Sequence, residues 1–257
     1  MKNKIGWCNT TWNPVWGCNN NCEYCYARGM AKRFKKSIAI KETVYKTERL
    51  DLLSPSQLLI EGDKIISSLD KFQPTFLHSQ FDKELPKKPQ RIFVGSMSEI
   101  AHWKKRWVRD TLDKILEYPQ HKFQFLTKFP KIYAQWYFHP NCWLGVTITK
   151  NDDFFKGAYN FIFPKNSETN RHNIKYISFE PLSGEISDLE ILKYFDWVII
   201  GAETGNRKGK VIPKKEWVEN IVNYCRKENI PVYLKDSLKD IYPVEIKEFP
   251  EKEIKSE

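Results

Sequence analysis

The feature that most constrains this chain is a group of three cysteines near its amino terminus. Cys18, Cys22 and Cys25 have the spacing C-x-x-x-C-x-x-C, and Tyr24 directly precedes the third cysteine. Three thiolates on one short loop can bind three irons of a [4Fe–4S] cluster, whereas a closed cluster or a structural zinc site needs a fourth ligand. The loop lacks that fourth ligand, so one metal position would stay open for a small molecule.

The other three cysteines, Cys8, Cys142 and Cys225, stand apart in the sequence. We expect each to be a small buried hydrophobic residue, with the alternative that one of them completes the metal site as a fourth ligand. Six cysteines in 257 residues are too few for a disulfide framework. The close grouping of three of them instead indicates metal ligation in a reducing compartment, and we expect a cytoplasmic protein.

The composition predicts a soluble globular protein with a basic surface. No apolar run approaches the roughly 20 residues that cross a bilayer, and the first residues lack the apolar core of a signal peptide, so we expect no membrane partner. Lysine and arginine outnumber acidic residues by 42 to 32, which gives a formal net charge of +10. Such a charge attracts polyanions, including nucleic acid, nucleotides and phosphorylated metabolites. Much of the excess lies in residues 1–36, where a solvated lysine-rich surface is the alternative interpretation.

Short apolar runs alternate with helical patterns along most of the chain, which is typical of βα units around a mostly parallel sheet. A helix is expected directly after the cysteines. Further helices are expected from about residue 54 to residue 70 and at 99–118, 129–138, 151–160, 188–195 and 214–228. Strands are expected near residues 12–15 and at 75–78, 91–95, 122–126, 143–148, 175–179, 197–201 and 231–234.

This spacing predicts an α/β fold, a complete or partial (β/α) barrel of six to eight mostly parallel strands. A doubly wound open sheet is the alternative. Residues 1–242 are expected to form one domain, and residues 243–257 a loose, charged carboxyl-terminal tail. The sequence contains no G-x-G-x-x-G, Walker, H-E-x-x-H or G-x-S-x-G motif, so the corresponding nucleotide-binding, zinc-protease and hydrolase classes have no support.

Charged and polar residues follow several of the expected strands, and in parallel α/β folds the carboxyl ends of the strands carry the reactive groups. The residues at these ends are Ser96, Ser98, Lys128, Glu180, Gly201, Glu203 and Lys235. We expect the two lysines and two glutamates to converge on a pocket for a charged ligand. The turn at Gly201 would let backbone N–H groups approach a phosphate or a carboxylate. For each residue, a helix cap or a salt bridge at the rim is the alternative.

The loop Cys18-x-x-x-Cys22-x-Tyr24-Cys25 resembles the cluster-binding signature of the radical S-adenosylmethionine (SAM) superfamily. A larger part of the chain is similar to one uncharacterised family of phage and bacterial proteins. The similar segments are Thr11–Pro14 with Gly17-Cys18, then Cys25–Ala27, Phe93–Ser98, Trp143–Val146, Ser178–Leu182 and Asp196–Gly205. That family often has a wider gap between its first two cysteines, and the tighter gap here is the one that the radical SAM signature prefers.

The resemblance implies that Cys18, Cys22 and Cys25 ligate a [4Fe–4S] cluster whose fourth iron is chelated by the amino and carboxylate groups of SAM. With an electron from an external donor, SAM would be cleaved to methionine and a 5′-deoxyadenosyl radical that abstracts hydrogen from a substrate. Tyr24 would pack near the adenine or shield the cluster. Many radical SAM enzymes hold the SAM amino group with a Gly-Gly-Glu turn, which is absent here, so Ser96 and Ser98 are its candidate replacements.

The expected function is therefore that of an iron–sulfur radical SAM enzyme acting on a polyanionic or nucleotide-like substrate, with DNA or RNA modification or repair as one form of it. Lys128, Glu180 and Lys235 would act in catalysis, and Glu180, Gly201 and Glu203 would bind the cofactor. One alternative is a nucleic-acid-binding module in which the three cysteines and a remote cysteine or histidine hold structural zinc, although zinc sites usually bring two ligand pairs. Another is a degenerate barrel that serves as a partner protein without turnover.

Overall fold

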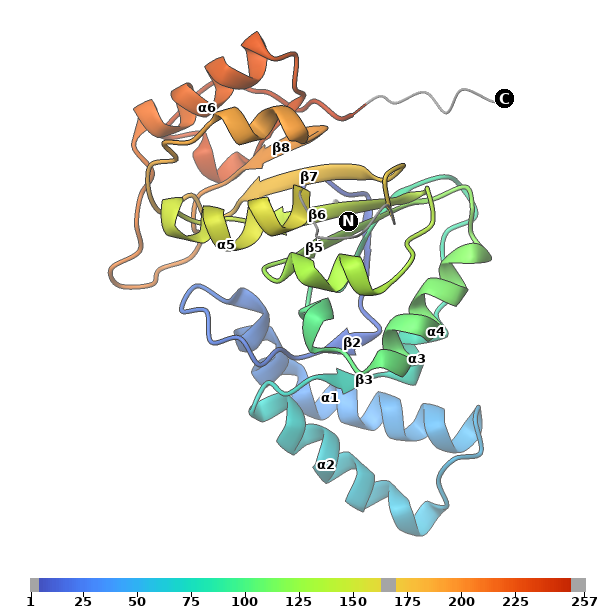
Figure 1. Cartoon of the computed structure of the whole chain (residues 1–257). Helices are drawn as coiled ribbons and strands as arrows, with labels where there is room; N and C mark the ends of the chain where they lie inside the picture. Colours follow the sequence, from blue (N-terminus) through green and yellow to red (C-terminus); the bar gives the residue numbers. More distant parts are fainter. Residues whose placement is uncertain (1–4, 163–169, 251–257) are drawn as a thin grey trace. The chain divides into compact units, whose positions relative to one another are not determined.

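The computed structural model describes residues 5–162 and 170–250, and it confirms the expected α/β fold with a partial (β/α) barrel. The main sheet has seven strands in the order β1-β4-β5-β6-β7-β8-β9. Their bounds are Thr10–Trp12, Arg91–Val94, Lys122–Thr127, Cys142–Thr147, Ile174–Phe179, Trp197–Ile200 and Val232–Leu234. The chain divides into two compact units, residues 10–123 and residues 1–9 with 124–257, which are described in turn (Figure 1).

In the unit of residues 10–123, β1 pairs in parallel with β4, and Trp12 lies opposite Val94. A second sheet pairs β2 (Val15–Trp16) antiparallel with β3 (Thr75–Phe76). The expected strand at 75–78 therefore belongs to this small sheet and not to the main one. The reason is topological: the chain between β2 and β3 forms a helical hairpin, and the pairing of β2 with β3 closes its two ends.

The helical hairpin consists of α1 (Tyr26–Glu48) and α2 (Leu58–Asp70), with the short 3₁₀ helix η1 (Pro55–Gln57) before α2. The two long helices lie side by side (Figure 1). Ala39 of α1 and Ile65 and Leu69 of α2 form a buried apolar cluster between them. The helices expected after the cysteines and from about residue 54 are thus confirmed.

The other helices of this unit are α3 (His78–Phe81), the 3₁₀ helix η2 (Ile100–His102) and α4 (Lys105–Leu116). The single helix expected at 99–118 is split, because Trp103 and Lys104 have extended backbones. Glu42 of α1 is fully buried and accepts hydrogen bonds from the backbone N–H groups of His78 (2.7 Å) and Ser79 (2.9 Å). This carboxylate caps the amino terminus of α3 and joins it to α1.

In the other unit, β6, β7, β8 and β9 pair in parallel. Trp7, Tyr176 and Trp197 pack their rings together in the core, with centroids between 5.4 and 6.3 Å apart. The α-helices are α5 (Asn151–Ile162) and α6 (Lys215–Lys227). The helices expected at 129–138 and 188–195 are the 3₁₀ helices η3 (Pro130–Gln135) and η4 (Glu190–Tyr194), and a further one is η5 (Asp236–Leu238).

Residues 243–250 differ from the loose tail that we expected. Lys247 forms an antiparallel bridge with Tyr233, and Phe249 packs against Trp197 at a centroid distance of 5.4 Å. Apolar contacts and backbone hydrogen bonds therefore hold this part of the tail against β9, while residues 251–257 lie outside the described residues. Across the described ranges, no helix combines the length and the apolar character needed to cross a membrane.

Candidate functional site

The three cysteines lie on the connection between β2 and α1, and two backbone hydrogen bonds fix the start of this connection. The Gly17 N–H donates to the Met97 carbonyl (3.0 Å), and the Cys18 N–H donates to the Phe72 carbonyl (2.8 Å). Gly17 has a φ of +100°, and a Cβ there would lie 2.5 Å from the carbonyl carbon of Gln73. Glycine is required because the chain both adopts a left-handed conformation and passes directly over another backbone.

The rest of the loop is held by local contacts. The Cys25 N–H donates to the Cys22 carbonyl (3.2 Å), and Cys25 is the residue from which α1 begins. The Asn20 N–H donates to Cys18 Sγ (3.2 Å). Arg28 donates to the Asn20 carbonyl (2.9 Å), so α1 holds the loop from its other side. All three cysteines are free of disulfide bonds and half-buried, and Tyr24 is also half-buried.

A histidine that sequence reasoning missed contacts this loop from η2. His102 Nδ1 accepts a hydrogen bond from the Asn19 N–H (3.3 Å) and lies 3.5 Å from Cys18 Sγ. Partial burial raises the pKa of the Cys18 thiol to about 11, and the negative charge of Glu99 adds to the effect. The sequence did carry one signal for this contact, because His102 closely follows the Ser96–Ser98 segment already identified as a strand end.

The structure brings Ser96 and Ser98 into the same unit as the cysteine loop and joins them to it. Ser98 forms a parallel bridge with Gly17. Ser96 Oγ donates to Asn13 Oδ1 (3.0 Å), and the Trp103 indole N–H donates to Ser98 Oγ (3.0 Å). The helix-capping alternative does not hold for these serines, because Glu99 caps η2.

No three His, Cys, Asp or Glu side chains in the described ranges are already gathered as a metal site. The donor set nevertheless has the chemistry that an iron–sulfur cluster needs: three free thiols on one short loop. The loop backbone is fixed at Gly17, at Cys18 and at the start of α1. The residues present therefore fit a three-cysteine cluster.

Three of the expected strand-end residues meet in the other unit. The Lys235 ammonium, after β9, is hydrogen-bonded to the Glu180 carboxylate, after β7. The stem of Lys235 packs over Gly201, after β8, where a Cβ would lie 2.9 Å from Lys235 Cδ. The carboxyl ends of three neighbouring strands thus build one small polar cluster, in which Gly201 is needed for the close approach of the lysine.

The other two expected residues of this unit have different positions. Glu203 forms a bidentate salt bridge with Arg207, whose guanidinium nitrogens lie 2.7 and 2.8 Å from the two carboxylate oxygens. The hydrogen bond from the Arg207 guanidinium lowers the pKa of the Glu203 carboxyl, whose side chain is 5% exposed. Glu203 is therefore engaged in a salt bridge, which is the alternative that we gave for such residues. Lys128 directly follows β5 and is half-buried.

Comparison with known proteins places the chain in a family without assigning an activity. The model of the family described as "Protein of unknown function (DUF5131)" matches residues 2–241. The match covers nearly the whole chain, which therefore belongs to this family. No curated protein matches the chain.

Proposed function

We propose that this member of the DUF5131 family is an iron–sulfur radical SAM enzyme in which Cys18, Cys22 and Cys25 hold a [4Fe–4S] cluster. The observation that carries the proposal is the three-cysteine loop, whose backbone is bonded at Gly17 to the serine-rich segment 96–98. When bound, the cluster and SAM would supply a 5′-deoxyadenosyl radical by reductive cleavage.

The two serines have the hydrogen-bonding capacity to receive SAM. Ser96 donates its hydroxyl proton to Asn13, so its oxygen can accept a hydrogen bond from the amino group of SAM. Ser98 accepts from Trp103, so its hydroxyl proton can be donated to the carboxylate of SAM. Asn13 and Trp103 thus act as positioning residues that give the two hydroxyls opposite roles.

The cluster of Glu180, Gly201 and Lys235 supports a charged ligand as substrate or cofactor. The Lys235 ammonium is a cation that a phosphate can approach, and the Glu180 carboxylate orients it. We therefore propose a polyanionic or nucleotide-like substrate, with modification or repair of DNA or RNA as one form. The free cysteines and the need for an external electron donor favour a reducing, cytoplasmic setting.

Anaerobic reconstitution of the full chain with iron and sulfide tests this proposal. We expect close to four irons and four sulfides per chain, an electron paramagnetic resonance signal after reduction, and 5′-deoxyadenosine and methionine on addition of SAM. Cys18→Ser, Cys22→Ser and Cys25→Ser should each lose the cluster. Cys225→Ala is the matched control, since it removes a buried cysteine outside the loop and should keep the cluster.

Three outcomes would contradict the proposal. Formation of neither a cluster nor 5′-deoxyadenosine overturns it. Protein that carries zinc without iron or sulfide indicates instead the zinc-stabilised nucleic-acid-binding module. A cluster with no more than one SAM cleaved per chain, even in the presence of the true substrate, indicates a partner protein without turnover.

A further inference from the structure

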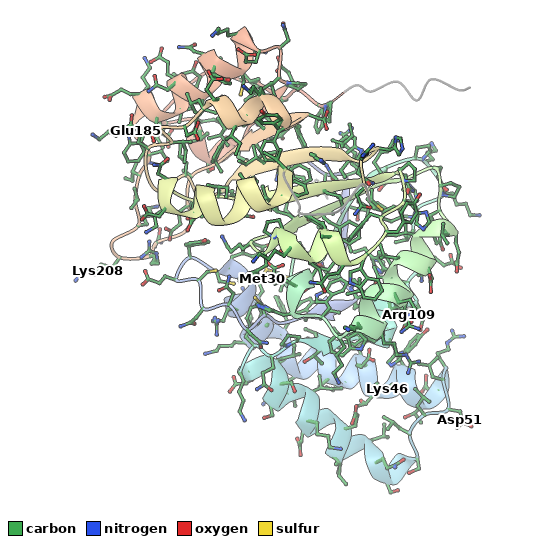
Figure 2. All side chains as sticks on the ribbon, in the orientation of Figure 1. Met30, Lys46, Asp51, Arg109, Glu185 and Lys208 are labelled. Atoms are coloured by element: carbon green, nitrogen blue, oxygen red, sulfur yellow. The ribbon has the colours of Figure 1, made fainter. Side chains whose placement is uncertain are left out.

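Residues 204–215, between β8 and the first residue of α6, form a strongly basic segment that we name the basic loop. It contains the basic residues Arg207, Lys208, Lys210, Lys214 and Lys215 and no acidic residue. Lys208 lies at its outer end and points away from the ribbon (Figure 2). The chain as a whole has a formal net charge of +10, so this short stretch concentrates a large part of the excess.

The basic loop has a defined conformation. Arg207 is held by the bidentate salt bridge with Glu203, and Lys210 Nζ donates to the Gly205 carbonyl (2.8 Å). Gly205 and Gly209 have φ values of +85° and +76°, with nothing within 4 Å of a Cβ at either position. Glycine is thus used here for the turn itself and not for close packing. Arg207 and Lys210 shape the loop, Lys214 Nζ lies 5.7 Å from the centroid of the Trp217 ring, and Lys208 and Lys215 are exposed.

Three lysines of the basic loop carry positive charge that no acidic side chain neutralises. Lys208, Lys214 and Lys215 are exposed, and none of them forms an ion pair with another described residue. Exposed Val211 and Ile212 lie between them in the chain, with 39% and 66% of their surface accessible. In the chain, Val211 and Ile212 thus separate Lys208 from the adjacent lysines Lys214 and Lys215.

The basic loop follows a strand that contributes to the polar cluster of Glu180, Gly201 and Lys235. It continues directly from the carboxyl end of β8, after Gly201 and Glu203. Gly201 packs against Lys235, which in turn binds Glu180. In parallel α/β sheets, ligands bind outside the carboxyl ends of the strands. A polyanion on the basic loop would lie next to this polar cluster within the same unit.

We propose that the basic loop binds the phosphodiester backbone of a nucleic acid, which would make nucleic acid the substrate class of the proposed enzyme. Lysines spread along an exposed loop suit successive phosphates better than the single phosphate group of a metabolite, which is usually held by groups that converge on one point. Val211 and Ile212 offer apolar contact to sugars or bases. That the bound nucleic acid is a substrate rests on the proposed function. The binding itself needs neither the cluster nor SAM.

Fluorescence anisotropy with the full chain, without reconstitution, tests the proposal. Labelled 20-nucleotide single-stranded DNA, single-stranded RNA and duplex DNA would be titrated at several salt concentrations between 25 and 200 mM. The test variant is Lys208→Glu/Lys214→Glu/Lys215→Glu. The matched control is Lys64→Glu/Lys88→Glu/Lys131→Glu, which makes the same change in net charge at exposed lysines elsewhere.

We expect the unaltered chain to bind at least one of these probes in a salt-dependent manner. The basic-loop variant should weaken binding about tenfold or more. The slope of log K against log[salt] should become less steep by about 2, because each lost phosphate contact removes about 0.7 to 0.9 from its magnitude. The control should retain most of the affinity. Thermal melts would check folding, and Lys→Ala at the same three positions would replace any charge-reversal variant that does not fold.

Several results would overturn the proposal. Equal losses in the two triple variants would show that only the overall charge matters. Absence of binding by the unaltered chain, or loop-dependent binding of tripolyphosphate alone, would exclude nucleic acid in favour of a small phosphorylated ligand or an acidic protein. None of these results bears on cluster formation, so they leave the radical SAM proposal to its own test.

Discussion

Gly17→Ala is the substitution with the sharpest predicted effect on the cysteine loop. The added Cβ would overlap the carbonyl group of Gln73, which is backbone and cannot rotate away. The positive φ costs an alanine about 1–2 kcal/mol. Relief of the overlap would break the hydrogen bond from Cys18 to the Phe72 carbonyl, which adds about 1 kcal/mol. We expect a total destabilisation of about 2–3 kcal/mol.

Two other glycines give matched controls for this prediction. Gly205 also has a positive φ, but nothing lies within 4 Å of a Cβ there, so Gly205→Ala should cost about 1–2 kcal/mol. Gly29 is in α1 with open space around it, and Gly29→Ala should stabilise the chain by about 0.5–1 kcal/mol. The order of the three variants separates steric overlap from backbone conformation.

Urea unfolding followed by circular dichroism measures these differences, and iron loading after reconstitution gives a second readout. Under the proposed function, Gly17→Ala should also lower the iron content, because it displaces Cys18, while Gly205→Ala should not. If Gly17→Ala were no less stable than Gly205→Ala, the close approach of Gly17 to residues 72–74 would not exist. That result would remove the argument that this backbone contact fixes the loop.

Two further predictions concern buried carboxylates. Glu42→Ala should destabilise the chain by about 3 kcal/mol in urea unfolding, because it leaves the buried N–H groups of His78 and Ser79 without an acceptor; a loss below 1 kcal/mol would refute this cap. The Glu203 bridge adds stability above the ordinary glutamate pKa, and this stability is lost as pH falls through the lowered pKa of the folded state. In Arg207→Met, the melting temperature should therefore decrease less between about pH 5 and pH 3 than in the unaltered chain. An equal decrease in both would contradict a stabilising salt bridge between Glu203 and Arg207.

The central strands were predictable because burial on both faces leaves a plain sequence signal. All four residues of β8 are fully buried and apolar, and the expected strand at 197–201 matches it closely. The length of α1 was not predictable in this way. Beyond residue 36, the residues it buries are Ala39, Glu42 and Thr43, two of which are polar and belong to no apolar stripe. A capping carboxylate buried inside a helix pair is visible only once the partner segment is placed.

The site shows the same division between local and distant contacts. Cysteine spacing identified the loop, since all three proposed ligands are close in the chain. For contacts across the sequence, such as that of His102 with Cys18 over 84 positions, the only sign was that His102 closely follows the strand end at Ser96–Ser98. The pairing of Glu203 with Arg207 is different, because only four positions separate the two residues.

Cys8, Cys142 and Cys225 were the candidates within the chain for a fourth cysteine ligand of the proposed metal site. Cys8, Cys142 and Cys225 are all buried, as expected from the sequence, with at most 5% of their surface exposed. Burial raises the pKa of the Cys142 and Cys225 thiols, to about 12 for Cys225. Cys225 also packs on the buried face of α6, which it would have to leave to reach a metal.

The zinc alternative can draw its fourth ligand from a histidine, and His102 Nδ1 lies 3.5 Å from Cys18 Sγ. If His102 completed such a site, His102→Ala would lose zinc together with the three cysteine variants. In the three-cysteine cluster that we propose, the same variant keeps its iron, because the fourth position belongs to SAM. His102→Ala thus separates the two metal hypotheses by metal content alone, without any measurement of turnover.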